Sequence, residues 1–295
     1  MINKIEMLRI ALFTGLLLLT GITSASQELR PLWAEDKMPY SKANDLIEEE
    51  KESWGTRCVF NVVIPQLYIY PAQGKNSGKA VIIIPGGGYE VEAIYHEGHD
   101  VARELAKDGI TAAVLKYRLP LAESSDTPEK LPITDVQRAL ELMRQWAGLY
   151  GFETDNIGVM GFSAGGHLAA FACSKVLQRP NFSLIIYGCP RLSDENVDWL
   201  ENKLFHRTMT EQEYDEFNIL EQVNSSTPPS FLVHALDDKV CHYEETSEYA
   251  AALRRHNVAF ELHTFPDGGH GFGLGDESNG TDQWIGLAIR WIKRL

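Results

Sequence analysis

Cysteine is scarce in this chain, and no two cysteines are spaced as a pair. The four cysteines are far apart, at Cys58, Cys173, Cys189 and Cys241, without a C-x-x-C motif. This spacing argues against a zinc ribbon or a dithiol redox site and leaves any disulfide pairing open. Cys173 and Cys189 lie in apolar segments, so we expect buried thiols there rather than a bridge. The nine histidines are dispersed and H-E-x-x-H is absent, so no metal or cofactor is predicted.

Basic residues are also outnumbered. There are 27 Lys and Arg residues against 41 Asp and Glu residues, which gives a net charge of −14. Nucleic acid and anionic membrane surfaces would repel such a chain, so neither is expected as a partner. The charge does not identify a substrate, because a neutral carbohydrate or small ester is indifferent to it. The oligomeric state stays open.

Long apolar runs are missing except near the amino terminus. Lys4 and Arg9 precede the apolar stretch 10–19, and small residues follow at 23–26. The stretch is shorter than the roughly 20 residues that span a bilayer. We therefore predict a signal peptide over 1–26, a secreted or periplasmic protein, and no membrane span after cleavage. A retained membrane anchor is the alternative.

Beyond residue 58 the chain alternates between strand and helix patterns. Short apolar runs predict strands, and apolar residues at helical spacing predict helices. The predicted strands are 58–64, 67–70, 80–84, 111–115, 156–160, 183–187, 230–234 and 259–263. The predicted helices are 98–107, 133–146, one that begins at Ser163, 243–255 and 282–293. This alternation indicates an α/β domain over 27–295, with a mostly parallel central sheet flanked by helices.

Two segments depart from this alternation. Residues 27–57 are polar and charged, and we interpret them as an irregular lead-in that lies over the domain. Residues 191–228 are polar with scattered aromatic residues, and a connection this long is usually functional. We predict a small cap insertion there. A surface excursion without catalytic consequence is the alternative.

The strongest functional motif is Gly161-Phe-Ser163-Ala-Gly165, which lies between a predicted strand and a predicted helix. G-x-S-x-G in this context is typical of a nucleophilic serine. The serine must occupy a strained turn that lifts its hydroxyl off the sheet, and the glycines avoid clashes there. A glycine-rich turn without function is the alternative.

A second glycine-rich motif, Pro85-Gly-Gly-Gly-Tyr89, directly follows the apolar strand 80–84. Glycines let backbone N–H groups approach a developing negative charge. We predict an oxyanion hole formed by the amides of Gly87 or Gly88 together with that of Ala164. The alternative of a phosphate-binding loop is disfavoured, because neither Lys-Ser/Thr nor G-x-G-x-x-G leading into a helix is present.

An acid and a histidine follow the last two predicted strands. Asp237 and Asp238 end the segment after 230–234, and His270 stands among glycines in the segment after 259–263. A loop histidine flanked by glycine has the freedom to reach both a serine and a carboxylate. We predict a triad of Ser163, Asp238 and His270. Asp237 is the alternative acid and is otherwise a turn former.

Several other polar residues have two interpretations. His96, Glu97 and His99 could line the pocket, but a solvated helix start explains them equally well. His167, next to the serine motif, is expected to pack or form a local hydrogen bond rather than act as a base. Tyr89 is expected at the pocket wall.

These motifs together resemble the α/β-hydrolase esterases related to acetylxylan and feruloyl esterases of bacterial polysaccharide degraders. They are more distantly similar to hormone-sensitive-lipase-like esterases. The matching segments are IIIPGGGY, EGHDVARELAKDGI, VLKYRLP, DVQRA, IGVMGFSAGGHLAA and FPDGGHGFGL. Relatives carry a D-x-V-V-P-type stretch after the acid strand, whereas this chain has His242 in place of the proline. The order serine, acid, histidine is the α/β-hydrolase order.

The resemblance implies an α/β-hydrolase fold and a serine esterase that removes acyl groups, especially acetyl, from plant cell-wall sugars such as xylan. Feruloyl esterase and general short-chain carboxylesterase activity are alternatives. A serine peptidase of the prolyl-oligopeptidase type would share the triad order, although it usually has an additional large propeller domain. An inactive carbohydrate-binding protein on the same fold is the remaining alternative.

Overall fold

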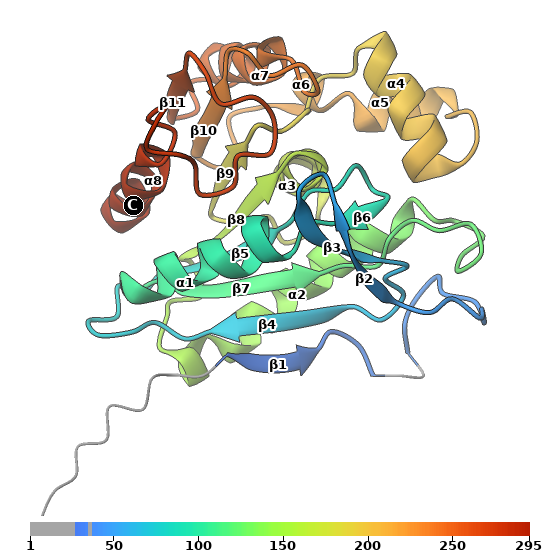
Figure 1. Ribbon diagram of the computed structural model, residues 1–295, viewed down its shortest axis with the longest axis horizontal. Coiled ribbons are helices and arrows are strands. Elements are labelled where there is room, and N and C mark those ends of the chain that lie inside the picture. Colours follow the sequence, from blue (N-terminus) through green and yellow to red (C-terminus); the bar gives the residue numbers. More distant parts are fainter. Residues whose placement is uncertain (1–26, 35–36) are drawn as a thin grey trace, which may run out of the picture.

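An eight-stranded, mostly parallel sheet forms the centre of the molecule (Figure 1). The computed structural model describes residues 27–34 and 37–295. The strands lie in the spatial order β1 (Glu28–Pro31), β4 (Gln66–Tyr70), β7 (Thr111–Lys116), β5 (Ala80–Ile84), β8 (Ile157–Phe162), β9 (Phe182–Ile186), β10 (Ser230–Ala235) and β11 (Phe260–Phe265). β1 and β4 are antiparallel to their neighbours, and the other six strands run parallel. The predicted fold class is confirmed.

Helices cover both faces of this sheet, which is why most of its strands are apolar throughout. The helices are α1 (Asp100–Lys107), α2 (Lys130–Tyr150), α3 (Ala164–Lys175), α7 (Tyr243–Arg255) and α8 (Gln283–Arg294). α1 packs beside α8, and α2 packs beside α3. Figure 1 shows α1 in front of the sheet and α2 behind it. In the ranges described, no helix is long and apolar enough to cross a membrane.

The predicted elements agree with the structure within a few residues, apart from the start of one helix. The chain forms a π-helical turn, η1 (Tyr95–His99), before α1 begins at Asp100. Single π turns inside helices are rare and often occur at functional sites. Glu97 and His99 within this turn are buried. The interpretation of these residues as a solvated helix start is therefore wrong.

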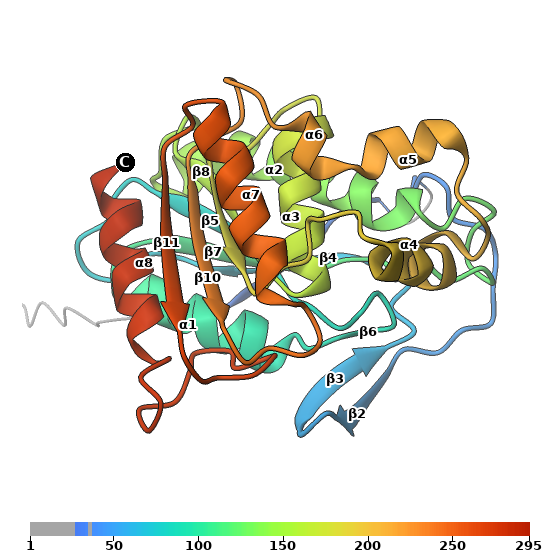
Figure 2. The same cartoon turned by 90° about the horizontal axis from the view of Figure 1, so that it is seen from above.

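The interpretation of residues 27–57 as irregular is also wrong in part. β1 extends the edge of the main sheet, and β2 (Glu49–Ser53) forms a hairpin with β3 (Thr56–Phe60). β3 also pairs with β6 (Val91–Glu92), and Figure 2 shows the hairpin projecting beside β6. β2 reads Glu-Glu-Lys-Glu-Ser and is mostly exposed. A strand with no apolar face gives no alternating pattern, so only its pairing with β3 defines it.

The segment 191–228 contains four short helices rather than an unstructured loop. These are α4 (Asp194–Leu200), η2 (Glu201–Phe205), α5 (Glu211–Phe217) and α6 (Ile219–Gln222). Ser193 caps α4, and a capping box of Thr210 and Glu213 begins α5. Several of its apolar side chains, including Phe205 and Phe217, are buried in the same core as the main sheet. That this segment acts as a cap stays a prediction, and the predicted signal peptide 1–26 lies outside the described residues.

Candidate active site

Four loops meet at one edge of the sheet because they follow four parallel strands. The glycine loop follows β5, Ser163 follows β8, the acid loop follows β10, and His270 lies in the loop after β11. The carboxyl ends of parallel strands meet at the same edge, where open α/β sheets place their ligand sites. Figure 2 shows the loop after β11 and strand β6 on the same side of the molecule, toward which the arrows of β10 and β11 point.

Ser163 occupies a strained turn between β8 and α3. Its backbone has φ 51° and ψ −122°, outside the regions that a non-glycine residue ordinarily adopts. Its N–H donates to the carbonyl of Ile186 on the neighbouring strand, at 3.1 Å. A Cβ on Gly165 would lie 2.1 Å from the carbonyl oxygen of Ile84, so only glycine fits there. This is the geometry that raises a serine hydroxyl above a sheet.

The structure brings together the three side chains that the sequence singles out as a triad. His270 Nε2 lies 2.8 Å from Ser163 Oγ, and His270 Nδ1 lies 2.7 Å from Asp238 Oδ2. Both are hydrogen-bond distances. A proton on Nδ1 is donated to the carboxylate, which leaves Nε2 to accept the serine proton.

The Asp238 carboxylate is buried and well supplied with donors. Its Oδ1 accepts the N–H groups of Val240 and Cys241, at 2.8 and 3.0 Å. Its Oδ2 lies 3.3 Å from Nε2 of the buried His234, in addition to its contact with His270. Burial acts to raise the pKa of Asp238, but hydrogen bonds from His234 and His270 outweigh it and hold the pKa below its ordinary value. Asp238 is therefore an anion at neutral pH.

The pKa of His270 is raised above its ordinary value. Burial acts to lower it, but the hydrogen bond to Asp238 and the surrounding negative charge outweigh that effect. Asp237, the alternative acid, has an exposed side chain whose Oδ1 accepts the N–H of Gly269 at 2.7 Å. Asp237 thus holds the backbone of the histidine loop and does not contact the imidazole.

The glycine loop contains backbone amides without a hydrogen-bond partner among the described residues. Among the described residues, the N–H groups of Gly87 and Gly88 form no hydrogen bond. Ala164 is the first residue of α3, where a helix N–H has no intrahelical partner. These three amides are the predicted oxyanion donors. Other bonds fix the loop: Glu97 Oε2 accepts the Gly86 N–H at 2.7 Å, and Trp199 Nε1 donates to the Gly88 carbonyl at 3.1 Å.

Aromatic side chains pack together beside the glycine loop. The Tyr89 ring stacks on Trp199 of α4, with centroids 5.3 Å apart, and its hydroxyl lies 2.8 Å from His167 Nδ1. His167 also stacks on Phe217 of α5. Burial lowers the pKa of His167 to about 3, so it stays neutral. The structure thus buries Tyr89 beside the glycine loop and gives His167 the local hydrogen bond expected of it. These contacts tie the segment 191–228 to the glycine loop. That Tyr89 lines the substrate pocket stays a prediction.

Two buried residues near this centre, His234 and Tyr187, have no role predicted from the sequence, and for Glu97 the sequence leaves two interpretations open. His234 is the penultimate residue of β10, and Tyr187 directly follows β9. Both residues therefore lie at the same sheet edge as the triad. Their position at the carboxyl end of a predicted strand is the sequence feature that could have predicted a role for them. Glu97 has no such signal, because the π turn that buries it is not visible in the sequence pattern.

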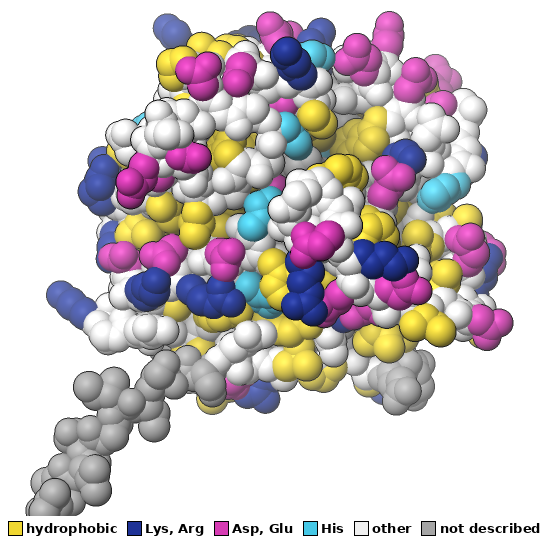
Figure 3. Space-filling model, viewed as in Figure 1, with side chains coloured by type: hydrophobic (Ala, Val, Ile, Leu, Met, Phe, Trp, Pro, Cys, Tyr) yellow, Lys and Arg dark blue, Asp and Glu magenta, His cyan; other side chains and the backbone are white. Residues whose placement is uncertain are grey.

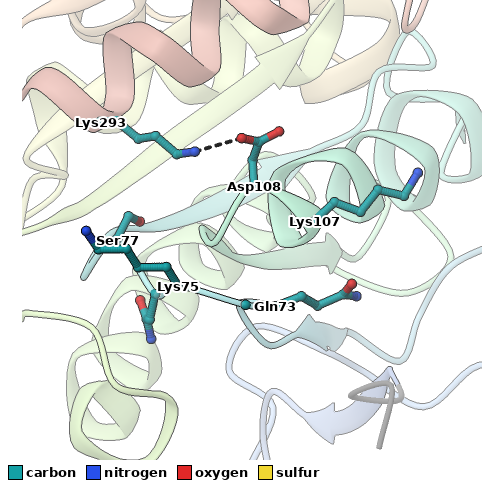
Figure 4. A pocket seen from close by; sticks show the side chains of 8 residues that line it. Gln73, Lys75, Ser77, Lys107, Asp108 and Lys293 are labelled. Carbon is teal, nitrogen blue, oxygen red and sulfur yellow. Dashed lines mark hydrogen bonds and ion pairs between the residues drawn. The ribbon is translucent and has the colours of Figure 1, made fainter. Parts of the chain in front are cut away.

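One hollow and the cysteine residues do not form part of the candidate active site. A hollow of about 530 Å³ is lined by residues including Gln73, Lys75, Lys107 and Lys293. Figure 4 shows Lys293 paired with Asp108 and Lys107 pointing away, and none of the triad lines this hollow.

The four cysteines are buried free thiols, as expected for Cys173 and Cys189. Within the described ranges, no group of three or more His, Cys, Asp or Glu side chains could hold a metal ion.

Comparisons with known proteins agree with this fold. The chain is 30% identical to an acetylxylan esterase of Xylanibacter ruminicola over 230 residues, which are 74% of this chain and 46% of that protein. It is 28% identical to an endo-1,4-beta-xylanase B of Butyrivibrio fibrisolvens, over 72% of this chain and 35% of that protein. The chain thus spans less than half the length of these two curated relatives.

A solved structure of similar size is also close to this one. It is an acetyl ester-xyloside bifunctional hydrolase from Caldicellulosiruptor lactoaceticus, with a TM-score of 0.76 and 29% identity. The match covers 90% of this chain and 96% of that one. The predicted resemblance to acetylxylan-esterase-type hydrolases is confirmed, and the prediction of a serine ester hydrolase agrees with these relatives.

Family models cover the chain from β4 to its end. A model named BD-FAE matches residues 66–183, and the model of the prolyl oligopeptidase family matches residues 129–295. The second match spans more than half of the chain and contains Ser163, Asp238 and His270. The chain therefore belongs to the prolyl oligopeptidase family, and within the α/β-hydrolase fold it is related to esterases.

Proposed function

We propose that this chain is a serine carboxylic-ester hydrolase that removes acetyl groups from plant cell-wall polysaccharide such as xylan. The observation that carries the proposal is the continuous hydrogen-bonded series of Ser163 Oγ, the His270 imidazole and the Asp238 carboxylate, with both contacts below 3 Å. Secretion or export to the periplasm belongs to the same proposal, because a polymeric substrate is met outside the cytoplasm.

The reaction would proceed as two acyl transfers. His270 Nε2 takes the Ser163 hydroxyl proton as Oγ attacks the ester carbonyl, while Asp238 stabilises the imidazolium. The amides of Gly87 or Gly88 and of Ala164 donate to the oxyanion of the tetrahedral intermediate. His270 returns the proton to the leaving sugar hydroxyl. A water molecule, deprotonated by His270, then releases the acid and restores Ser163.

A polar hollow lined by residues that follow β9 and β10 also suits a carbohydrate. It measures about 540 Å³ and lies between the start of the segment 191–228 and the start of α7. Arg191, Ser193 and His242 are among its lining residues. Cys189, two residues before Arg191, has its thiol 3.9 Å from the Ser163 carbonyl. None of the triad lines this hollow, but its polar side chains suit the hydroxyl groups of a sugar.

The surface charge also suits an uncharged substrate. On the face seen in Figure 3, acidic and basic side chains are interspersed, with no expanse of one sign. The names of the relatives favour acetyl esters of xylan over peptides. Membership in the prolyl oligopeptidase family keeps a serine peptidase as the second candidate, since peptide and ester hydrolysis share this triad.

The test is product analysis with acetylated, feruloylated xylan and the purified full chain. Acetate release that is absent in Ser163→Ala is the expected result. Ferulate release would instead indicate an aromatic acyl preference. Cleavage of small aryl acetates alone would contradict the polysaccharide substrate but not the triad. Turnover of an aminoacyl-proline substrate above that of aryl acetates would overturn the esterase proposal, and unchanged hydrolysis by Ser163→Ala would overturn the triad.

A further inference from the structure

Glu97 is a buried carboxylate that takes no part in the triad chemistry. Its side chain is 3% exposed, and both of its oxygens have partners. Oε2 accepts the backbone N–H of Gly86 at 2.7 Å, and Oε1 accepts the Tyr187 hydroxyl at 3.0 Å. Taking a carboxylate out of water is costly unless hydrogen bonds compensate for it. A neutral side chain would cost less free energy to bury than a carboxylate. The two hydrogen bonds of Glu97 therefore indicate that the carboxylate has a role in this site.

The first bond fixes the loop that carries the oxyanion donors. Gly86 immediately precedes Gly87 and Gly88, whose free N–H groups are the proposed donors. A Cβ on Gly86 would lie 2.7 Å from Ser163 Cβ and 2.8 Å from Glu97 Oε2. The Glu97 carboxylate therefore holds the loop at Gly86, where the loop passes beside the nucleophile Ser163.

The second bond reaches the loop that carries the catalytic base. The Tyr187 hydroxyl oxygen also accepts the N–H of Gly273 at 3.0 Å, three residues beyond His270. The Tyr187 ring packs against the His270 ring, with centroids 5.2 Å apart, and against Phe272 at 4.5 Å. An unbroken chain of hydrogen bonds thus runs from Gly86 through Glu97 and Tyr187 to Gly273.

We propose that Glu97, through Tyr187, is a positioning residue that holds the oxyanion loop and the histidine loop in fixed register. This proposal depends on the proposed triad and oxyanion hole, and it adds a determinant of their geometry. Oxyanion donors act only when they lie about 2.7–3.1 Å from the developing charge. A small shift of Gly86 moves the next two amides. Loss of Glu97 should therefore weaken transition-state binding and leave substrate binding nearly unchanged.

The test compares Glu97→Ala, Glu97→Gln and Tyr187→Phe in the full chain with 4-nitrophenyl acetate. We expect Glu97→Ala to lower kcat about 100-fold, as loss of an oxyanion donor does, with KM within about threefold. Glu97→Gln keeps one acceptor for the Gly86 N–H and can donate to the Tyr187 oxygen, so it should lose about tenfold. Tyr187→Phe keeps the Gly86 bond and should also lose about tenfold. The double variant Glu97→Ala/Tyr187→Phe should be no worse than Glu97→Ala, because both act through one chain.

A second readout separates positioning from general loss of structure. A trifluoromethyl ketone adds to the serine as a tetrahedral oxyanion, so its Ki should rise by the same factor as kcat/KM falls. Glu104→Gln is the matched control. Glu104 lies on α1, and its carboxylate forms an exposed pair with Lys107 without any contact to the glycine loop, so kcat should stay within twofold.

The kcat values of the Glu97 variants and the Ki of the ketone decide the proposal. A kcat of Glu97→Ala within threefold of the unmodified chain would overturn it, as would an unchanged Ki. If Glu97→Ala does not fold, Glu97→Gln decides: a tenfold loss in kcat with a parallel rise in Ki supports the proposal, and unchanged values overturn it. Ser163→Ala is measured in parallel, and its retention of activity would overturn the proposed triad instead.

Discussion

Asp237 and Asp238 are neighbours in the sequence but have different partners. Asp238 is buried against His270 and His234, whereas Asp237 is exposed and accepts one backbone N–H from the histidine loop. In the sequence, only the match to the family pattern favours Asp238 over Asp237. The reason for the difference is the turn after β10, which directs one carboxylate into the protein and the other toward solvent.

We predict that Asp238→Asn lowers kcat/KM for an aryl acetate by about 10⁴-fold, because the amide no longer stabilises the imidazolium or fixes its tautomer. Asp237→Asn should lose less than about threefold, because its amide oxygen can still accept the Gly269 N–H. Steady-state kinetics of the two variants side by side are the measurement. A large loss confined to Asp237→Asn would reverse the assignment.

The pH profile follows from the raised pKa of His270. The base must be neutral to take the serine proton, so activity should be lost as the pH falls through this pKa. The acid limb of kcat/KM should therefore lie above about 6.5, the ordinary value for histidine. The residual activity of Asp238→Asn should show this limb at lower pH, because the partner that raises the pKa is gone.

At the scale of elements, the loop between β5 and β6 is held from several sides. The Gly87 carbonyl accepts the N–H groups of Glu90 and Val91, at 3.0 and 3.1 Å. Tyr117 donates its hydroxyl to the Pro85 carbonyl at 3.2 Å. Together with the bonds to Glu97 and Trp199, these contacts fix the loop before substrate arrives. Donors that need no reorganisation are those that lower a reaction barrier most.

We predict that Gly87→Ala lowers kcat at least 100-fold. Gly87 has φ 131°, and a Cβ there would lie 2.0 Å from the carbonyl oxygen of Val91, so the loop must move. Displaced amides no longer match the oxyanion. Kinetics with an aryl acetate check this prediction, with thermal unfolding as a test of the fold. Gly74→Ala is the control. Gly74 also has a positive φ, but a Cβ there would meet no atom within 4 Å, and the residue is far from the triad in the sequence. Near-normal turnover by Gly87→Ala would contradict the oxyanion assignment.

At the scale of the whole molecule, a buried ion pair joins the amino-terminal segment to the sheet. The Asp135 carboxylate on α2 accepts from the Arg118 side chain at 2.7 Å and from Trp33 Nε1 at 2.7 Å. Arg118, which follows β7, also donates to the Pro39 carbonyl and the Ser41 hydroxyl, both at 2.7 Å. Arg118 and Asp135 are almost fully buried.

We predict that Asp135→Ala lowers the free energy of unfolding by about 3–5 kcal/mol, because it leaves a buried guanidinium without its partner. Urea unfolding followed by fluorescence measures the change. Glu104→Ala breaks an exposed pair with Lys107 and should leave the midpoint almost unchanged. Equal midpoints for the two variants would show that the buried pair does not stabilise the fold in this way.

The sequence by itself determined the alternation of strands and helices, the order of the loops, and the residue types at the site. Apolar runs specify buried strands because both faces of a parallel sheet are covered. Glycines around Ser163 and at positions 86 and 87 mark backbone that passes too close to other atoms for any side chain.

Only the tertiary structure decided which side chains meet. β2 is a strand because β3 offers it hydrogen bonds, and not because of its own charged residues. Glu97 is buried because a π turn rotates it behind the glycine loop, and His234 meets Asp238 because a tight turn follows β10. Such contacts depend on distances between segments far apart in the chain, and no local pattern encodes those distances.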